Sequence, residues 1–155
     1  MTDEDYMREA LREAQASSER GEVPVGAVIV NADGQIIART GNAPIAIVDP
    51  TAHAEILAIR DAAYGTDNYR LNGTTLYVTL EPCTMCAGAI SNARIERVVY
   101  GASDEKGGAV ENGVKFFEQA TCHHKPKVTG GILAKESAAM LKAFFRARRK
   151  NAKQK

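Results

Sequence analysis

The sequence predicts an α/β fold in which a mixed five-stranded sheet lies between two layers of helices, a three-layer α-β-α architecture. Two observations predict it. Short β-branched runs alternate with segments of helical periodicity, and the first two runs are separated only by the turn-forming residues 31–34. An opening hairpin followed by alternating strands and helices therefore predicts a mixed sheet.

The N-terminal part begins with a helix and the hairpin. Apolar side chains at helical spacing predict an amphipathic helix over residues 3–20, and the hairpin strands are expected at 25–30 and 36–39. A loop rich in turn formers then leads to Thr51, which we expect to cap a second helix that runs to about Tyr64.

The remaining elements continue the alternation. Residues 101–113 contain four glycines and predict a loop between the later strands and the last helix. The other expected elements, in chain order, are a buried strand at 74–80, a helix at 84–93, a strand at 97–100, a helical turn at 114–119, a short strand around Val128 and a helix at 134–149.

Length and composition indicate one domain, residues 1–150, with a short basic tail at 151–155. No apolar stretch approaches the ~18 residues of a membrane span, and the acidic N-terminal residues do not form a secretory signal. We therefore expect a cytoplasmic protein with no membrane partner. In that compartment the three cysteines are better explained as metal ligands or free thiols than as disulfides.

The net charge of +1 conceals an uneven distribution. Residues 142–155 hold seven Lys and Arg and no acid, whereas the rest of the chain carries 13 basic and 19 acidic side chains. A cationic end on an acidic body indicates a polyanionic partner such as nucleic acid. The alternative is a solvated helix end, where cations complement the helix dipole.

Two fragments carry the chemistry, His53-Ala54-Glu55 and Cys83-Thr84-Met85-Cys86. Each follows a loop at the expected start of a helix. A Cys-x-x-Cys pair at a helix entry brings two sulfurs to one point, and the helix dipole stabilises their thiolates. A histidine from another helix entry completes a mixed nitrogen and sulfur set that suits zinc. We therefore expect His53, Cys83 and Cys86 to hold a zinc ion.

The number of ligands decides what such a zinc does. Four protein ligands close a structural site, whereas three leave a position for a water whose pKa the metal lowers toward ~7. If Glu55 is not a ligand, its carboxylate can take a proton from that water and pass it to leaving ammonia. The alternatives are a redox-active cysteine pair, which leaves His53 without a role, and a closed zinc site. The fourth ligand of a closed site would be Cys122, His123 or His124.

At these residues the chain resembles the cytidine and deoxycytidylate deaminase superfamily, whose signature is His-x-Glu followed by Pro-Cys-x-x-Cys. The resemblance implies a cytidine deaminase-like fold, zinc on His53, Cys83 and Cys86, and Glu55 as general acid/base. Within that superfamily the chain is most similar to the bacterial tRNA-specific adenosine deaminases, over nearly its whole length. The likeness is carried by residues 22–28, 49–56, 69–71, 76–90 and 144–149.

That family implies a hydrolase that converts adenosine to inosine at the wobble position of a tRNA anticodon stem-loop. It also implies one zinc per subunit and a homodimer in which both subunits touch the RNA. The implied substrate contacts are Asn42 on the flipped base, Asp104 near the ribose, and Phe144, Arg146 and Arg149 along the RNA.

Each of these contacts has a plainer explanation. Asn42 is also a typical turn residue, Asp104 is an ordinary acid in a glycine-rich loop, and Phe144 is also a candidate for the core. The chain departs from the commonest family pattern at His123, where asparagine is more usual. Histidine also donates and accepts hydrogen bonds, so His123 is a candidate for the same RNA contact, although the change is equally compatible with a different base or nucleotide.

Two rival functions follow from the same residues. A deaminase of a free nucleobase, nucleoside or nucleotide, of the guanine or cytosine type, keeps the metal site but has no need of the basic C-terminal segment. A non-catalytic, zinc-stabilised RNA-binding module predicts a closed metal site and no release of ammonia.

Overall fold

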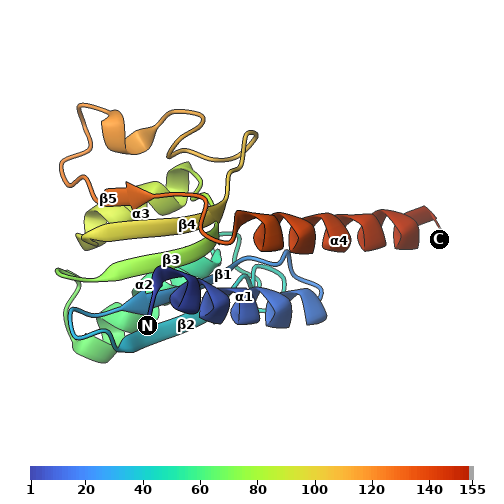
Figure 1. Ribbon diagram of the computed structural model, residues 1–155, viewed down its shortest axis with the longest axis horizontal. Coiled ribbons are helices and arrows are strands. Elements are labelled where there is room, and N and C mark those ends of the chain that lie inside the picture. Colours follow the sequence, from blue (N-terminus) through green and yellow to red (C-terminus); the bar gives the residue numbers. More distant parts are fainter. Residues whose placement is uncertain (154–155) are drawn as a thin grey trace.

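A five-stranded mixed sheet forms the centre of the protein in this computed structural model, which describes residues 1–153 (Figure 1). The strand order is β2-β1-β3-β4-β5. β1 pairs antiparallel with β2 and with β3, whereas β3, β4 and β5 run parallel, which confirms the predicted mixed sheet. The strands are β1 (Gly26–Val30), β2 (Ile36–Gly41), β3 (Thr75–Leu80), β4 (Arg97–Ala102) and β5 (Lys127–Thr129).

Helices cover both faces of this sheet, as the three-layer prediction requires. α2 (Ala54–Thr66) and α3 (Thr84–Ala93) pack on one face, behind the sheet in Figure 1. α1 (Asp3–Glu19) packs on the other face, and α4 (Ala134–Lys153) starts beside it and projects beyond the edge of the sheet (Figure 1). A single turn of 3-10 helix, η1 (Phe116–Glu118), lies in the segment between β4 and β5. No helix in residues 1–153 is both long and apolar enough to cross a membrane.

Small residues allow the helices to approach the sheet closely. On the α1 face, a Cβ built on Gly26 of β1 would lie 1.9 Å from the carbonyl oxygen of Ala10, so the α1 backbone rests directly on the strand. Met7 and Ala10 of α1 are fully buried there. On the other face the contact positions of α2 are alanines, among them Ala58 and Ala62. This close packing fixes where each helix begins relative to the sheet edge.

Three local expectations need correction. Thr51 does not cap α2, because its backbone N–H and its hydroxyl both donate to Oδ1 of Asp49, at 2.8 and 2.7 Å. α2 begins instead at Ala54, with His53 in the cap position. α4 continues to Lys153 and not only to 149, so residues 151–153 of the expected tail extend the helix, whereas residues 154–155 lie outside the described part.

Candidate active site

The two sequence fragments meet at the edge of the sheet where β3 ends. His53 is the N-cap residue of α2 and Cys83 is the N-cap residue of α3, and neither side chain caps its own helix. Their side chains therefore remain available to meet each other. Nδ1 of His53 lies 3.6 Å from Sγ of Cys83 and 3.5 Å from Sγ of Cys86.

These separations fit a zinc site. Two ligands bound at ~2.1 and ~2.3 Å at a tetrahedral angle lie about 3.6 Å apart, which is the spacing observed between the histidine nitrogen and each sulfur. The three ligand atoms all lie within 4.8 Å of one another, and no other His, Cys, Asp or Glu in the described chain joins the group. The geometry therefore leaves a tetrahedral position for a non-protein ligand.

Two of the three candidates for a fourth protein ligand, Cys122 and His124, have other partners, and the third, His123, lies outside the cluster. Sγ of Cys122 lies 3.5 Å from the hydroxyl of Ser91, in the core beside α3. The ring of His124 is hydrogen bonded to the carbonyl of Ile95 at 2.7 Å. The closed zinc site, one of the alternatives, has no support in this arrangement.

The electrostatics of the cluster suit metal binding and proton transfer. A hydrogen bond from the Cys86 thiol, with further help from His53, lowers the pKa of Cys83 to about 4, so this sulfur is a thiolate at neutral pH. Glu55, in the first turn of α2, is only 4% exposed. Burial raises the pKa of its carboxyl to about 7, which allows it to accept and release a proton near neutral pH.

Asn42 lies next to this cluster and has a structural role that the sequence did not reveal. Its Oδ1 accepts a hydrogen bond from the backbone N–H of Ala54 at 2.9 Å. Asn42 therefore caps the start of α2, which the side chain of His53 does not do. The hydroxyl of Ser17, in α1, donates to the Asn42 carbonyl at 3.0 Å. With Oδ1 occupied, the orientation of the amide is set, and its Nδ2 group remains as a possible hydrogen-bond donor to a ligand.

Asp104 lies in the glycine-rich loop and is attached to the metal motif through Glu81. The backbone N–H of Asp104 donates to Oε1 of Glu81 at 2.9 Å. Its own Oδ1 accepts from the N–H groups of Lys106 and Gly107, at 3.2 and 2.9 Å. The side chain thus shapes its own turn.

The other expected contacts lie away from the metal cluster. His123 lines a small cavity at the C-terminal end of α3, with Ser91 and Arg94. This cavity and the metal cluster lie at opposite ends of α3, which has ten residues and is therefore about 15 Å long. Within a single chain, His123 is thus distant from Glu55.

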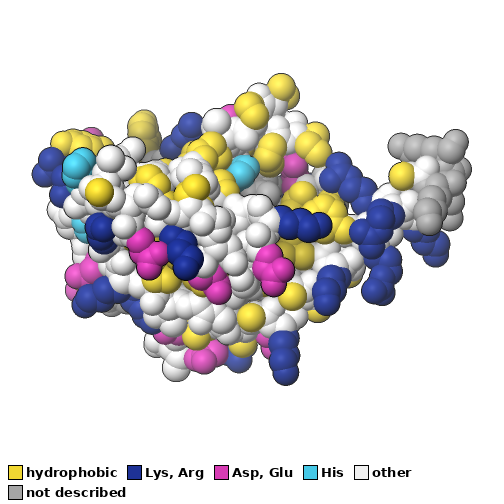
Figure 2. Space-filling model, turned by 90° about the horizontal axis from the view of Figure 1, so that it is seen from above, with side chains coloured by type: hydrophobic (Ala, Val, Ile, Leu, Met, Phe, Trp, Pro, Cys, Tyr) yellow, Lys and Arg dark blue, Asp and Glu magenta, His cyan; other side chains and the backbone are white. Residues whose placement is uncertain are grey.

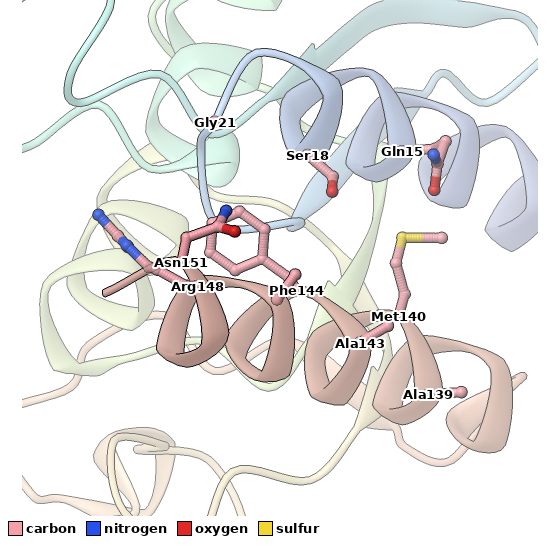
Figure 3. Close-up of a pocket in the computed structure, with 10 residues that line it drawn as sticks. Gln15, Ser18, Gly21, Ala139, Met140, Ala143, Phe144, Arg148 and Asn151 are labelled. Atoms are coloured by element: carbon pink, nitrogen blue, oxygen red, sulfur yellow. The ribbon is translucent and has the colours of Figure 1, made fainter. Parts of the chain in front are cut away.

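Phe144 is half-buried in a groove of about 740 Å³ between α1 and α4, where it lies across from Ser18 and Gly21 (Figure 3). It is therefore not a core residue. The guanidinium of Arg148 lies 5.6 Å from the centre of its ring. Arg146 and Arg149 are exposed on the same helix.

Glu81 is the residue that the sequence-based reasoning missed. It directly follows the strand expected at 74–80, and in the structure it is 2% exposed and accepts hydrogen bonds from the glycine-rich loop. Burial raises the pKa of its carboxyl, but the amides of Asp104, Asn112 and Val110 outweigh that effect and hold the pKa below its usual value. An acid directly before the Pro-Cys motif, followed by a glycine-rich loop, is the only signal that could have indicated this role.

Comparison with known proteins agrees with the fold and the site. The family model of the cytidine and deoxycytidylate deaminase zinc-binding region matches residues 1–102, so the chain contains a zinc-binding deaminase domain. Curated proteins named tRNA-specific adenosine deaminase match almost the whole chain. The one from Agrobacterium fabrum is 58% identical over 144 residues, 93% of this chain and 94% of that protein. The one from Haemophilus influenzae is 50% identical over 151 residues, 97% of this chain and 87% of that protein. The chain belongs to the tRNA-specific adenosine deaminase family.

Solved structures show the same relationship. A structure from studies of A-to-I editing by tRNA:A34 deaminases at the wobble position of transfer RNA superimposes with a TM-score of 0.87 at 58% identity, covering 88% of this chain and 99% of that one. Guanine deaminase from Bacillus subtilis superimposes with a TM-score of 0.63 at 34% identity, covering 80% of this chain and 89% of that one. The fold is thus shared by relatives that are named for different substrates.

Proposed function

We propose that this protein deaminates adenosine to inosine hydrolytically at the wobble position of a tRNA anticodon. The observation that carries the proposal is the three-ligand cluster of His53, Cys83 and Cys86 beside the buried Glu55. Three protein ligands leave room for water, and a buried carboxyl outside the ligand set can move protons. The tRNA substrate is supported by the membership of the family and by the basic α4.

The residues divide the reaction between them. His53, Cys83 and Cys86 would hold zinc, which supplies Lewis-acid activation of a water molecule. Water adds to C6 of adenine, the bond from C6 to the exocyclic nitrogen breaks, and ammonia leaves. Glu55 takes one proton from the water and delivers it to the ring nitrogen; it then takes the second proton from the new C6 hydroxyl and delivers it to the amine, which leaves as ammonia.

Asn42 is the group best placed to bind the base. The Ala54 N–H holds its Oδ1, so its Nδ2 is presented as a donor, which suits an acceptor nitrogen of a purine. Asp104 is proposed to lie near the ribose. A wobble adenosine is easily extruded because it is not paired within its loop.

The projecting α4 is proposed to hold the RNA. Figure 2 shows Lys and Arg side chains gathered along the arm that extends from the body of the protein. Arg146 and Arg149 can contact phosphates, and Phe144, beside Arg148, provides a ring on which an unstacked base can stack. His123, at the end of α3 far from the metal cluster, would contact a part of the RNA that is distant from the reacting base.

Two finer points complete the proposal. We expect a homodimer, because large apolar side chains are exposed on the loop before α2 and near its C-terminal end; these are Ile45, Ile47, Val48, Tyr64 and Tyr69. We also expect the enzyme to act in the cytoplasm. The mass of the protein in solution, measured by light scattering, tests the first point.

Ammonia release measured side by side on an anticodon stem-loop, adenosine, guanine and cytidine tests the proposed function. We expect turnover on the stem-loop and little on the free compounds, because only the stem-loop engages α4. Faster turnover of guanine than of the stem-loop would replace the proposal with the free-base alternative, which the guanine deaminase relative makes the natural competitor.

A further inference from the structure

Glu81 is a buried carboxylate with an unusual set of partners. It follows the last residue of β3 and precedes Cys83 by two positions, and it is 2% exposed. None of the ion pairs among the described residues involves Glu81. A charged group that is buried without a cation needs several hydrogen bonds to replace its water.

The glycine-rich loop supplies these hydrogen bonds. Oε1 accepts from the N–H of Asp104 at 2.9 Å and from Nδ2 of Asn112 at 2.7 Å. Oε2 accepts from the N–H groups of Val110, Glu111 and Asn112, each at 3.0 Å. Both ends of the segment 104–112 therefore converge on a single carboxylate, and three consecutive amides form a nest around one of its oxygens.

Two further observations show that the loop is folded around this group. A Cβ built on Gly108 would lie 2.3 Å from Cδ of Glu81 and 2.5 Å from the Asp104 carbonyl, so the chain passes too close for a side chain. The backbone N–H of Ala109 donates to the carbonyl of Pro82 at 2.9 Å. The loop is thus attached at consecutive residues, Glu81 and Pro82, immediately before the first cysteine of the metal motif.

We propose that Glu81 is a positioning residue, whose carboxylate holds the loop 103–112, and with it Asp104, in a fixed place beside the metal-binding motif. Glu81 itself does not touch substrate. Replacing this carboxylate with a neutral amide leaves one acceptor oxygen and places an NH₂ donor against N–H groups of the loop, so part of the attachment that positions Asp104 is lost. Only one part of the inference rests on the proposed function, namely that Asp104 faces the substrate.

The test compares two buried carboxylates. Glu22 is also 2% exposed and accepts hydrogen bonds from the N–H groups of Ile45 and Ala46, in a different loop. Glu81→Gln and Glu22→Gln therefore lose a similar kind of interaction at two different places. Hydrogen exchange followed by mass spectrometry should show the amides of 103–112 exchanging roughly 10- to 100-fold faster in Glu81→Gln, the factor expected from one or two charge-assisted hydrogen bonds. The same amides should be unchanged in Glu22→Gln, and zinc content should be unchanged in both.

A double-mutant cycle separates positioning from general stability. On an anticodon stem-loop, well below the unfolding temperature, we expect kcat/KM to fall at least about tenfold in Glu81→Gln. In an Asp104→Ala background the same substitution should cost much less, since the group that it positions is gone. Equal costs in the two backgrounds would overturn the link to Asp104.

The outcomes can be told apart even if the proposed function is wrong. The exchange measurement needs no substrate, so inactivity of the wild type on the stem-loop refutes the proposed function and leaves the exchange result to decide the role of Glu81. If Glu81→Gln does not fold, Asn112→Ala removes a single donor from the same carboxylate and should accelerate the same amides. Unchanged exchange of 103–112 in whichever of these variants folds would overturn the proposal.

Discussion

Asn42 offers a way to separate the stability of the site from its chemistry. Its Oδ1 caps α2 through the N–H of Ala54, while its Nδ2 is the proposed donor to the base. Asn42→Ala removes both groups, whereas Asn42→Asp keeps an acceptor oxygen and removes the donor. The two variants should therefore fail in different ways.

The magnitudes follow from the contact. Asn42 is 9% exposed and Ala54 is fully buried, so Asn42→Ala leaves a buried N–H without an acceptor at a helix start. That loss should lower the free energy of unfolding by about 1–3 kcal/mol, which for a chain of this size lowers Tm by roughly 2–4 °C per kcal/mol. Asn42→Asp should stay within about 1 kcal/mol of the wild type, because a carboxylate also caps a helix and favours its positive end.

Asn42→Asp should keep the stability of the wild type but lose activity. Both variants should lose at least about tenfold in kcat/KM on a stem-loop, because neither has a donor for the purine. Thermal unfolding tests the capping role, and the rate of inosine formation tests the contact with the base. Both should be measured on the same preparations, with their zinc content determined. Asn42→Ala with wild-type stability would refute the capping role, and Asn42→Asp with wild-type turnover would refute the contact with the base.

The remaining predictions concern the basic helix and the N-terminal ion pair. Replacing Arg146, Arg148 and Arg149 with glutamine should weaken stem-loop binding and reduce its salt slope by up to ~2, at about 0.7 per phosphate contact. An unchanged slope in a binding titration would make α4 a solvated helix end. Asp3→Asn should lower the free energy of unfolding by about 1 kcal/mol at pH 7, because it breaks a two-point contact with Arg97 at 2.7 and 3.0 Å. The hydrogen bonds from Arg97 lower the pKa of Asp3, so the pair stabilises the fold above the unfolded pKa of ~3.9. Denaturant titrations should therefore show the deficit shrinking as pH falls through the lower, folded pKa; a deficit independent of pH would contradict this assignment.

Much of the fold and the metal cluster could be predicted because their signals are local. The Cys83-x-x-Cys86 pair and His53 are recognisable as helix entries from the residues around them, and the structure places both Cys83 and His53 in cap positions. The hairpin and the parallel strands follow from the order of short apolar runs and helical segments.

The errors and omissions involve interactions whose choice of partner the sequence does not specify. Thr51 is a good cap by type, but Asp49 takes its hydrogen bonds, and the real cap comes from Asn42, twelve positions before Ala54. The partners of Glu81 named above lie 23 to 31 residues later in the chain, so its role could not be predicted from the residues next to it. The position of His123 depends on how the segment after β4 folds against α3.

The role of Glu55 is the central claim, and single-turnover deamination tests it most directly. Zinc-loaded wild type and Glu55→Gln would be mixed in excess with a stem-loop that carries the wobble adenosine, with inosine measured over time and zinc counted in the same samples. A general acid/base outside the metal shell predicts about one zinc per chain in both proteins and a rate reduced by ~10²–10⁴ in the variant. A variant that loses zinc in proportion to its activity would make Glu55 a ligand, and a variant that forms inosine at the wild-type rate would remove it from the mechanism.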